Sequence, residues 1–293
     1  KLFKIKTRLV RQKNWWHLYL PSPYHLTHGK SHPITEWYQR LGLERARSYE
    51  KQLPEILFNA SEEQIRFFLH HLWATDGNIS WKKIKGRTPG ASVYYSTTSE
   101  KLAEQVQHLL LRVGILSRQS TVVKKGYRPC YHVAVQGCTA QIKFLEKIGC
   151  YGLRGANIPF MLETLRNTVP NPNNDVIPRE AWDIWIKPIK NEIGIGWREV
   201  CQRLETAYCG DTLFKSGLSR QRMTRVATAL KSKPLMQIAN ADVYWDELVA
   251  ICPLQVEEVF DATVPGNHNF VANDFIVHNS LEQDSDVVLM LYR

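Results

Sequence analysis

The segment Val277-His278-Asn279-Ser280 carries side chains that can cut the chain at one peptide bond. The amide nitrogen of the Asn279 side chain can attack its own backbone carbonyl, closing a five-membered succinimide and releasing the residue that follows. The neighbouring imidazole of His278 can protonate the leaving amine or polarise the carbonyl. Ser280 then presents a hydroxyl nucleophile at the cut. These residues predict an autocatalytic cleavage site, although the bare tripeptide also occurs by chance.

A second candidate for chemistry is Asp76, at the end of a predicted helix. The helix starts with a Ser61-x-x-Gln64 capping box, and Gly77 suits the left-handed cap position that ends it. One helical face is apolar and comprises Ile65, Phe68, Leu69, Leu72 and Trp73. The carboxylate of Asp76 would lie at the negative end of the helix dipole, where a bound Mg²⁺ would offset the repulsion. The Asp-Gly pair alone is more often a plain turn.

Several stretches around Asp76 occur in a characteristic order. Upstream lie Gly42-Leu43 and 48–54, and downstream 96–99 caps a helix that closes at Gly114-Ile115. Its inward residues are predicted to be Leu102, Ala103, Val106, Leu110 and Val113, and a strand follows at 131–135. The order resembles the second half of a LAGLIDADG homing endonuclease of the kind embedded in inteins, with 72–77 as its second signature helix.

The resemblance implies roles for particular residues in Mg²⁺-dependent cleavage of double-stranded DNA. Asp76 would hold the metal, and Lys51 would polarise the attacking water or the scissile phosphate, which suits phosphodiester hydrolysis. Lys124, Lys125 and Lys143 are all candidates for the symmetry-related lysine. The family uses two signature helices that each give one aspartate, and Asp76-Gly77 is the only Asp-Gly pair here. The first aspartate is expected upstream of Lys1.

The charge of the chain favours a polyanionic partner. It has 38 Lys and Arg against 28 Asp and Glu, a formal charge of +10 over 293 residues. From Asp246 onward nine acids face one base, so the rest carries +18. No apolar run is long enough for a membrane span, and no signal core is present. We expect a soluble, cytoplasmic protein that binds DNA and no membrane.

Two segments are predicted to contact DNA. The first is a basic, aromatic hairpin, with an apolar face of Phe3, Ile5 and Leu9 and a second strand near Trp15 to Leu20; an ordinary amphipathic hairpin is the alternative. Its candidate contacts are Lys4, Lys6, Arg8, Arg11 and Lys13. The second follows a loop at 167–178 and consists of short helices at 197–204 and 219–230. There Ser219 is the expected N-cap, and Arg220, Arg222 and Arg225 would reach phosphates, unless the module is only a spacer.

The region before Asn279 alternates as short strands at 249–251, 257–260, 270–271 and 276–277, with a turn at Pro265-Gly266. Within this region, residues 256–280 resemble the last two motif blocks of an intein. The resemblance implies that Asn279 cyclises, that His278, His268 and Asp261 assist proton transfer, and that Ser280 begins the downstream host protein. No cofactor is needed for this reaction. The first residue and the Thr-x-x-His block of the family are not found here, so splicing would require a missing N-terminal half as a partner.

The residues after the cut, 280–293, are similar to a late motif of DnaB-family replicative helicases, which would assemble as homo-hexamers. No G-x-x-x-x-G-K-[ST] loop occurs, so ATP binding belongs only to the complete host helicase. Both ends of the chain read as cut, and we expect the carboxy-terminal part of an intein-containing helicase.

The predicted fold class is α+β, with a partial LAGLIDADG-type αββ saddle, a small helical module and the all-β C-terminal half of a Hint splicing domain. The corresponding segments are 1–165, 166–241 and 242–279, followed by the host residues 280–293. Two alternatives remain open. One is a free-standing or degenerate LAGLIDADG protein without splicing, and the other is a basic DNA-binding module without catalysis.

Overall fold

The computed structural model describes residues 3–86, 88–253, 255–256 and 264–278. The chain divides into two compact units, Lys1–Thr168 and Val169–Arg293. The division falls at the start of the predicted loop 167–178. That segment is not entirely a loop, because it contains a short 3₁₀ turn and a two-residue strand that pairs within the second unit. No described helix has both the length and the apolar character needed to cross a membrane.

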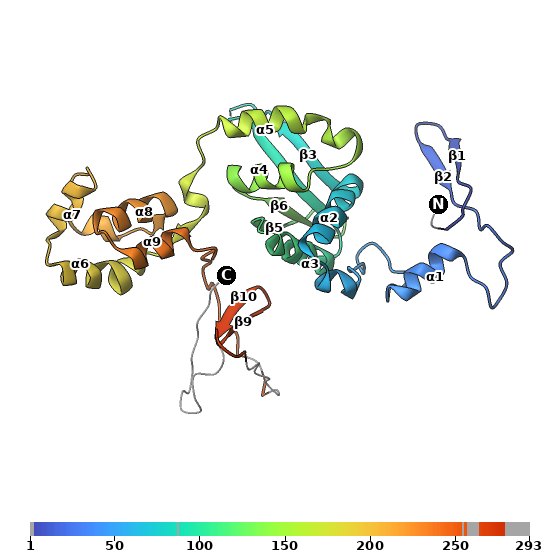
Figure 1. The fold of residues 1–293 in the computed structure, drawn as a ribbon. Helices are drawn as coiled ribbons and strands as arrows, with labels where there is room; N and C mark the ends of the chain where they lie inside the picture. Colours follow the sequence, from blue (N-terminus) through green and yellow to red (C-terminus); the bar gives the residue numbers. More distant parts are fainter. Residues whose placement is uncertain (1–2, 87, 254, 257–263, 279–293) are drawn as a thin grey trace. The chain divides into compact units, whose positions relative to one another are not determined.

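The first unit contains a four-stranded antiparallel sheet in the order β3-β4-β6-β5, against which helices pack (Figure 1). In chain order its elements are β1 (Arg8–Arg11), β2 (Trp16–Tyr19), α1 (Pro33–Arg40), η1 (Glu55–Asn59), α2 (Glu62–Asp76), β3 (Gly77–Lys82), β4 (Gly90–Thr97), α3 (Glu100–Arg112), β5 (Ser117–Val122), β6 (Cys130–Val135), α4 (Gly137–Lys147), η2 (Gly152–Asn157) and α5 (Ile158–Arg166). From α2 to α4 the order is therefore α-β-β-α-β-β-α.

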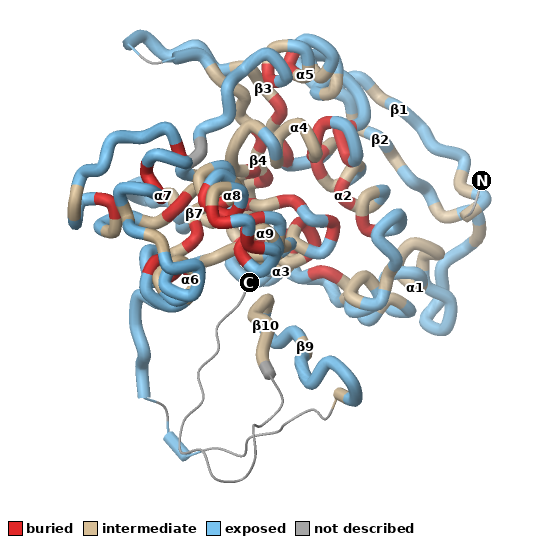
Figure 2. The backbone as a smooth tube through the Cα atoms, turned by 60° about the vertical axis from the view of Figure 1, so that its left-hand side comes forward, coloured by how far each residue is buried: buried red, intermediate tan, exposed pale blue. Residues whose placement is uncertain are grey.

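The predicted helices around Asp76 are confirmed, since they are set by local capping and periodicity. Ser61 and Gln64 form the reciprocal capping box of α2, whose buried residues are Ile65, Leu69 and Trp73. Ser99 caps α3, and the five residues predicted to point inward are all buried. Figure 2 shows the buried positions concentrated in these helices and in the sheet. The α+β class predicted from the sequence is thus observed in this unit.

The expected left-handed cap at Gly77 is wrong. Gly77 has φ −79° and ψ 161°, because α2 ends at Asp76 and the chain enters β3 at once. Glycine is needed for a different reason. A Cβ atom built on Gly77 would lie 2.4 Å from Cδ1 and 2.6 Å from the carbonyl oxygen of Trp73. The close approach of β3 to the last turn of α2 leaves no space for a side chain.

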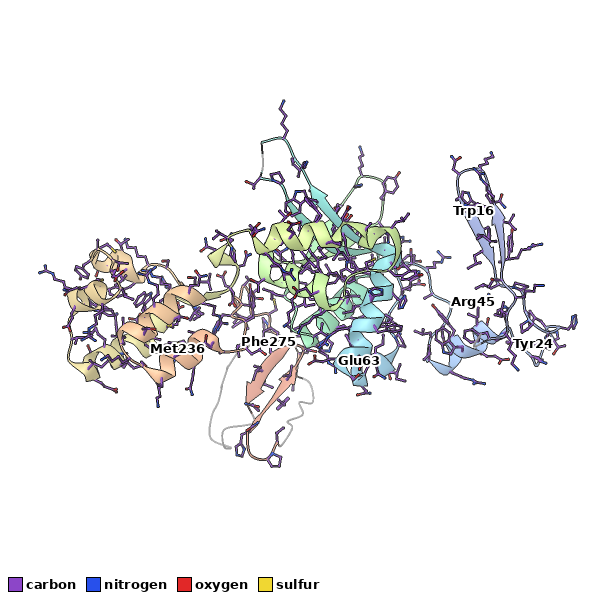
Figure 3. The ribbon with its side chains drawn as sticks, turned by 45° about the horizontal axis from the view of Figure 1, so that its top comes forward. Trp16, Tyr24, Arg45, Glu63, Met236 and Phe275 are labelled. Carbon is purple, nitrogen blue, oxygen red and sulfur yellow. The ribbon has the colours of Figure 1, made fainter. Side chains whose placement is uncertain are left out.

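The N-terminal hairpin forms, but its first strand begins later than expected, at Arg8. β1 pairs with β2 from Arg8 opposite Tyr19 to Arg11 opposite Trp16. Lys4 and Lys6 precede the strand, and Lys4 has a φ of 51°, so the predicted strand through Phe3 and Ile5 is wrong. No residue of β1 or β2 is buried, and Figure 3 shows Trp16 standing on this hairpin.

The second unit has a core of its own, built around Trp182 and the following helices. Its elements are η3 (Pro172–Asn174), β7 (Val176–Ile177), the π-helical turn η4 (Trp182–Ile186), α6 (Lys187–Ile193), α7 (Trp197–Arg203), η5 (Gly210–Phe214), β8 (Leu218–Ser219), α8 (Arg220–Ala229), α9 (Lys233–Asn240), β9 (Asn269–Ala272) and β10 (Phe275–His278). The predicted helices 197–204 and 219–230 are confirmed as α7 and α8.

The predicted strands at 270–271 and 276–277 are confirmed as the antiparallel hairpin β9–β10. Asn273 and Asp274 join its strands with φ values of 48° and 68°, the conformation of a two-residue type I′ turn. The strand predicted at 249–251 is wrong, because this segment has no pairing partner among the described residues and leaves Val249 87% exposed. The strand predicted at 257–260 lies outside the described residues.

We predict that Gly77→Ala lowers the free energy of unfolding, because the added methyl group must displace Trp73 or the backbone of α2. Overpacking of this kind costs roughly 1–3 kcal/mol. Urea unfolding followed by tryptophan fluorescence would measure the loss. Gly90→Ala at the start of β4 is the matched control, since its Cβ would meet nothing within 4 Å. Equal stability of the two variants would contradict the proposed close packing.

Candidate nucleic-acid interface

The junction between α2 and β3 fixes the position of Asp76. Asp76 is the last residue of α2 and is exposed, while the next residue, Gly77, is buried and pairs with Tyr95 on β4. Three aromatic rings pack together on the core side of the junction. The Trp73 ring lies 5.6 Å from Tyr95 and 4.8 Å from Phe144, measured between ring centroids. The carboxylate is thus attached to the rigid core.

Arg154 supplies the cation that the carboxyl end of α2 prefers. Its Nη1 donates to the carbonyl oxygens of Trp73, at 3.2 Å, and Ala74, at 2.8 Å, and also to that of Thr75. The Trp73 carbonyl also accepts from the backbone N–H of Gly77, and a guanidinium at these last carbonyls opposes the negative end of the dipole. A protein side chain therefore provides part of the compensation that the sequence assigned to a metal ion.

The charge of Asp76 also acts on its neighbour Tyr95. Burial, with a further contribution from the Asp76 carboxylate, raises the pKa of the Tyr95 phenol to about 12. Burial penalises the phenolate, and the nearby negative charge adds repulsion.

The residues present do not by themselves form a magnesium site. Among the described residues, no three His, Cys, Asp or Glu side chains gather where they would hold a metal ion. Asp76 contributes one carboxylate, and the guanidinium of Arg154 occupies the carbonyls before it. Mg²⁺ favours several oxygen ligands around it. A second carboxylate from elsewhere would be required.

The face of the sheet opposite the core is polar, and it was not among the sites predicted from the sequence. Alternate residues point to this face, while Ile79, Val93 and Val133 point to the core. By strand alternation the open face comprises Asn78, Ser80 and Lys82 on β3, Gly90, Ser92, Tyr94 and Ser96 on β4, Arg118, Ser120 and Val122 on β5, and Cys130, His132 and Ala134 on β6. Period-two alternation in 77–82 and 90–97 was the signal that would have revealed it.

Cations and flat rings are combined on this open face. The rings of Tyr94 and His132 stack at 4.9 Å, and the Lys82 ammonium lies 5.3 Å from the Tyr94 ring centroid. Burial, together with the charges of Lys82 and Lys124, lowers the pKa of His132. The imidazole is therefore neutral near pH 7 and leaves the positive charge to the lysines and Arg118. Such a surface suits phosphate contacts and base stacking.

Comparison with known proteins gives this segment a family. A family model described as a LAGLIDADG-like domain matches residues 63–149, from the first turn of α2 to the end of α4. Residues 63–149 form a LAGLIDADG-like domain. The resemblance predicted from the sequence is confirmed for this segment. The matched residues include Asp76 and the four strands of the open sheet face, and Arg154 follows them in the chain.

The whole chain is also similar to replicative helicases. It is 42% identical to the replicative DNA helicase DnaB of Synechocystis sp. and 46% identical to that of Rhodothermus marinus, over 99% of this chain in both cases. It spans only 33% and 31% of those proteins. A more distant match is a DNA gyrase subunit of Mycolicibacterium flavescens, 26% identical over 82% of this chain and 41% of that protein. A LAGLIDADG-like domain within a DnaB-like chain is the combination expected from the sequence.

Lys51 lies beside the LAGLIDADG-like domain, and its backbone is anchored to it. The Ser99 hydroxyl donates to the Lys51 carbonyl oxygen at 2.6 Å, and Gln105 accepts from the backbone of Leu53 at 2.8 Å. The Lys51 side chain is exposed. No interaction among the described residues joins Lys51 to Asp76, so their joint role stays a prediction. Of the candidate second lysines, Lys143 donates to the Gly114 carbonyl and caps α3.

In the hairpin β1–β2 the basic residues do not share one face. Arg8 stands opposite Tyr19 and lies 4.9 Å from the centroid of that ring. Arg11 shares the other face with Leu9 and Trp16, both more than half exposed. The predicted division into a basic and an apolar face is wrong, because Arg11 follows Arg8 by three residues and so points to the opposite side. Lys4, Lys6 and Lys13 lie outside the strands.

The arginines of α8 serve the helical module itself. Arg220 donates to the carbonyls of Ile238, Ala239, Ala241 and Val243 at the end of α9 and pairs with Asp175 at 3.1 Å. Arg225 donates to the Leu204 carbonyl, and Arg222 lies over Trp182. Arg220 and Arg225 therefore act as structural caps, and phosphate contact by either of them stays a prediction. Their guanidinium groups are already bound to backbone carbonyls.

The β9–β10 hairpin brings together the two segments that carry the expected splicing histidines. In its register His278 is opposite Asn269, the residue after His268. His268 has a φ of 53°, and its backbone N–H bonds the Val264 carbonyl at 3.2 Å. Asp261, Asn279 and Ser280 lie outside the described residues. The backbone thus sets His268 at the end of the hairpin from which Asn279 follows.

The raised pKa of Tyr95 predicts a loss of stability at high pH. The folded state keeps the phenol protonated up to about pH 12, whereas the unfolded chain ionises near pH 10. The unfolded state is therefore favoured progressively between these values, by about 2 kcal/mol in total. Tyr95→Phe should remove this component, so the variant should gain stability relative to the natural protein as the pH rises from 9.5 to 11.5, as measured by urea unfolding. A difference that is constant across this range would refute the assignment.

Proposed function

We propose that this chain is the carboxy-terminal part of an intein that interrupts a DnaB-type replicative helicase and carries a LAGLIDADG endonuclease domain. The observation that carries the proposal is the pattern of relatives. The chain resembles DnaB proteins over nearly all of its own length, and it resembles a gyrase protein over most of it. A helicase and a gyrase have different tasks, so the segment that both share is best explained as an insertion with its own function.

Asn279 cyclisation would cut the C-terminal junction between the insertion and its host. The Asn279 amide nitrogen forms a bond to its own carbonyl carbon, the bond to the Ser280 nitrogen breaks, and the leaving amine accepts a proton. His278, the residue before Asn279, could donate this proton. The pairing of His278 with Asn269 supports a role for His268 as well, because His268 immediately precedes Asn269. Asp261 would assist the proton transfer. Because a two-stranded hairpin is marginal by itself, the splicing site needs further strands from an N-terminal intein segment.

The endonuclease part would bind double-stranded DNA on the open face of the sheet. Lys82 and Arg118 would contact phosphates, and the stacked rings of Tyr94 and His132 support a surface for bases or sugars. A Mg²⁺ ion would require Asp76 and a second carboxylate from a matching signature helix, and Lys51 would act beside them. When bound, the metal would supply an activated water.

The host would be a hexameric helicase in the bacterial cytoplasm. ATP would bind to the complete helicase and not to this segment, and the host sequence resumes at Ser280. The alternative is a degenerate LAGLIDADG protein that binds DNA without splicing. One observation favours it, because Arg154 occupies the helix end where a metal-binding site would be built. Cleavage of the bond between Asn279 and Ser280 distinguishes the splicing protein from this alternative.

We predict that the chain alone cleaves slowly before Ser280 and that an N-terminal intein segment from a DnaB relative, supplied in trans, accelerates the cleavage. Asn279→Ala should abolish release of the peptide that begins at Ser280, because the nucleophilic amide is lost. His278→Ala should slow release by ~10² to 10⁴, the usual contribution of a positioned acid or base. Mass spectrometry would detect the peptide. Release from the Asn279→Ala protein at the natural rate would leave only the endonuclease interpretation.

We further predict that double-strand cleavage depends on pairing this domain with a second signature helix. The chain alone should not cut its target DNA, because it offers one carboxylate. With the upstream segment restored, cutting should require Mg²⁺ and should be lost in Asp76→Ala but retained in Glu63→Ala, a control acid in the first turn of α2. Gel analysis of a plasmid carrying the uninterrupted host gene would measure this. Cutting by the Asp76→Ala protein would show that the metal site lies elsewhere.

A further inference from the structure

The helical module contains an acid-free stretch of strong positive charge. Residues 215–241, which include α8 and α9, contain six Lys and Arg residues and no Asp or Glu. Arg220 and Arg225 donate to backbone carbonyls and Arg222 lies over Trp182, as described above, while the exposed cations are Lys215, Arg225, Lys231 and Lys233. Of the six cations, the described ion pairs neutralise only Arg220. A polyanion is therefore the kind of partner that this surface attracts.

The two helices present this charge on a rigid support. Ser219 and Ser232 cap the starts of α8 and α9 by accepting from the backbones of Arg222 and Leu235. The Arg220 guanidinium ties the start of α8 to the end of α9, and the Arg203 guanidinium caps the end of α8 at the Ala229 carbonyl. Since both ends of the helix pair are fixed, α9 is held in one orientation within its module.

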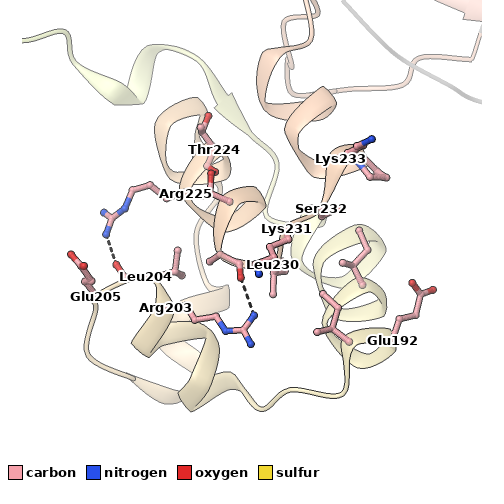
Figure 4. A pocket seen from close by; sticks show the side chains of 15 residues that line it. Glu192, Arg203, Leu204, Glu205, Thr224, Arg225, Leu230, Lys231, Ser232 and Lys233 are labelled. Atoms are coloured by element: carbon pink, nitrogen blue, oxygen red, sulfur yellow. Dashed lines mark hydrogen bonds between the residues drawn. The ribbon is translucent and has the colours of Figure 1, made fainter.

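The exposed face of α9 carries one cation and two amide side chains. Leu235 and Ala239 are buried against α8, whereas Lys233, Gln237 and Asn240 are exposed. The exposed residues are four and three positions apart and so lie on one helical face. Figure 3 locates α9 through Met236, and Figure 4 shows Lys231 and Lys233 around its first turn. Gln and Asn can make paired hydrogen bonds to adenine, and Lys binds guanine or phosphate.

We propose that the exposed face of α9 binds double-stranded DNA in the major groove, with Lys233 contacting phosphate and Gln237 and Asn240 contacting base edges. This second contact rests on the proposed function only in taking duplex DNA as the ligand. The DNA-contacting helix of the module is then α9 and not α8, whose arginines were the candidates from the sequence. A pocket lined by residues of α6, α7, α8 and the start of α9 borders this surface at Lys233; Glu192 and Glu205 line it, whereas Gln237 and Asn240 do not.

The test compares two charge-matched variants of the full chain. Lys233→Glu with Gln237→Glu alters α9, and Arg198→Glu with Gln202→Glu alters the exposed face of α7 at the same spacing. Each pair changes the net charge by the same amount in the same module. An acid in the first turn of α9 is favourable for the helix dipole, so the variant should fold. If circular dichroism shows otherwise, Lys233→Ala with Gln237→Ala replaces it.

Binding to a labelled mixed-sequence duplex is measured by fluorescence anisotropy over a range of salt. The α9 variant should bind about ten-fold more weakly and lose about one unit of the log–log salt slope, the usual effect of one phosphate contact. The α7 variant should change affinity much less. Equal weakening by both variants, or by neither, would overturn the proposal. Arg118→Glu tests DNA binding by the open sheet face separately. Weaker binding by this variant would support the proposed function even if the α9 variant binds normally.

Selection from a randomised duplex pool tests the base contacts separately. Gln237→Ala and Asn240→Ala should each relax the preference at one position of the selected sequence while binding to non-selected DNA is retained. An unchanged selected sequence for both variants would remove the base-reading part of the proposal. A preference that moves only with Arg118→Glu would assign recognition to the sheet and overturn the role of α9.

Discussion

The packing of Gly77 against Trp73 is the constraint on which the LAGLIDADG-like domain depends. Trp73 is fully buried, although its indole Nε1 has no acceptor among the described residues. An unsatisfied buried donor costs about 1–3 kcal/mol, so packing of this ring must outweigh that loss. The same packing lets α2 pass directly into β3. Asp76 is thereby held at the one point where a helix end, a strand start and the open sheet edge meet.

Local features of the sequence predicted the elements well, and features set by tertiary contacts were missed. The capping box at Ser61 and the helix face at Leu69 follow from neighbours three or four residues away. Gly77 was assigned the wrong backbone conformation because its environment is set by the approach of β3. The open sheet face was overlooked for the same reason. Its members, such as Tyr94 and His132, come from different strands that only the fold brings together.

The arginines illustrate why charge in a sequence does not identify a binding surface. Arg154, Arg203 and Arg220 all donate to carbonyls at helix carboxyl ends. A planar guanidinium with several donors suits this task as well as it suits a phosphate. In sequence the two uses look alike, so α8 was the natural candidate for DNA contact. Its arginines bond to carbonyls within the module, and Lys233, Gln237 and Asn240 of α9 are the exposed side chains that we propose to contact DNA.

The two proposed activities depend on missing partners for different physical reasons. The splicing residues adjoin a two-stranded hairpin, whose geometry needs additional strands to become rigid. The proposed endonuclease site, in contrast, would lie on a well-packed domain and would need a second carboxylate beside Asp76. Adding an N-terminal segment should therefore order the splicing end and complete the metal site by separate mechanisms. Loss of one activity by mutation need not impair the other, since Trp73 and the β9–β10 hairpin belong to different units.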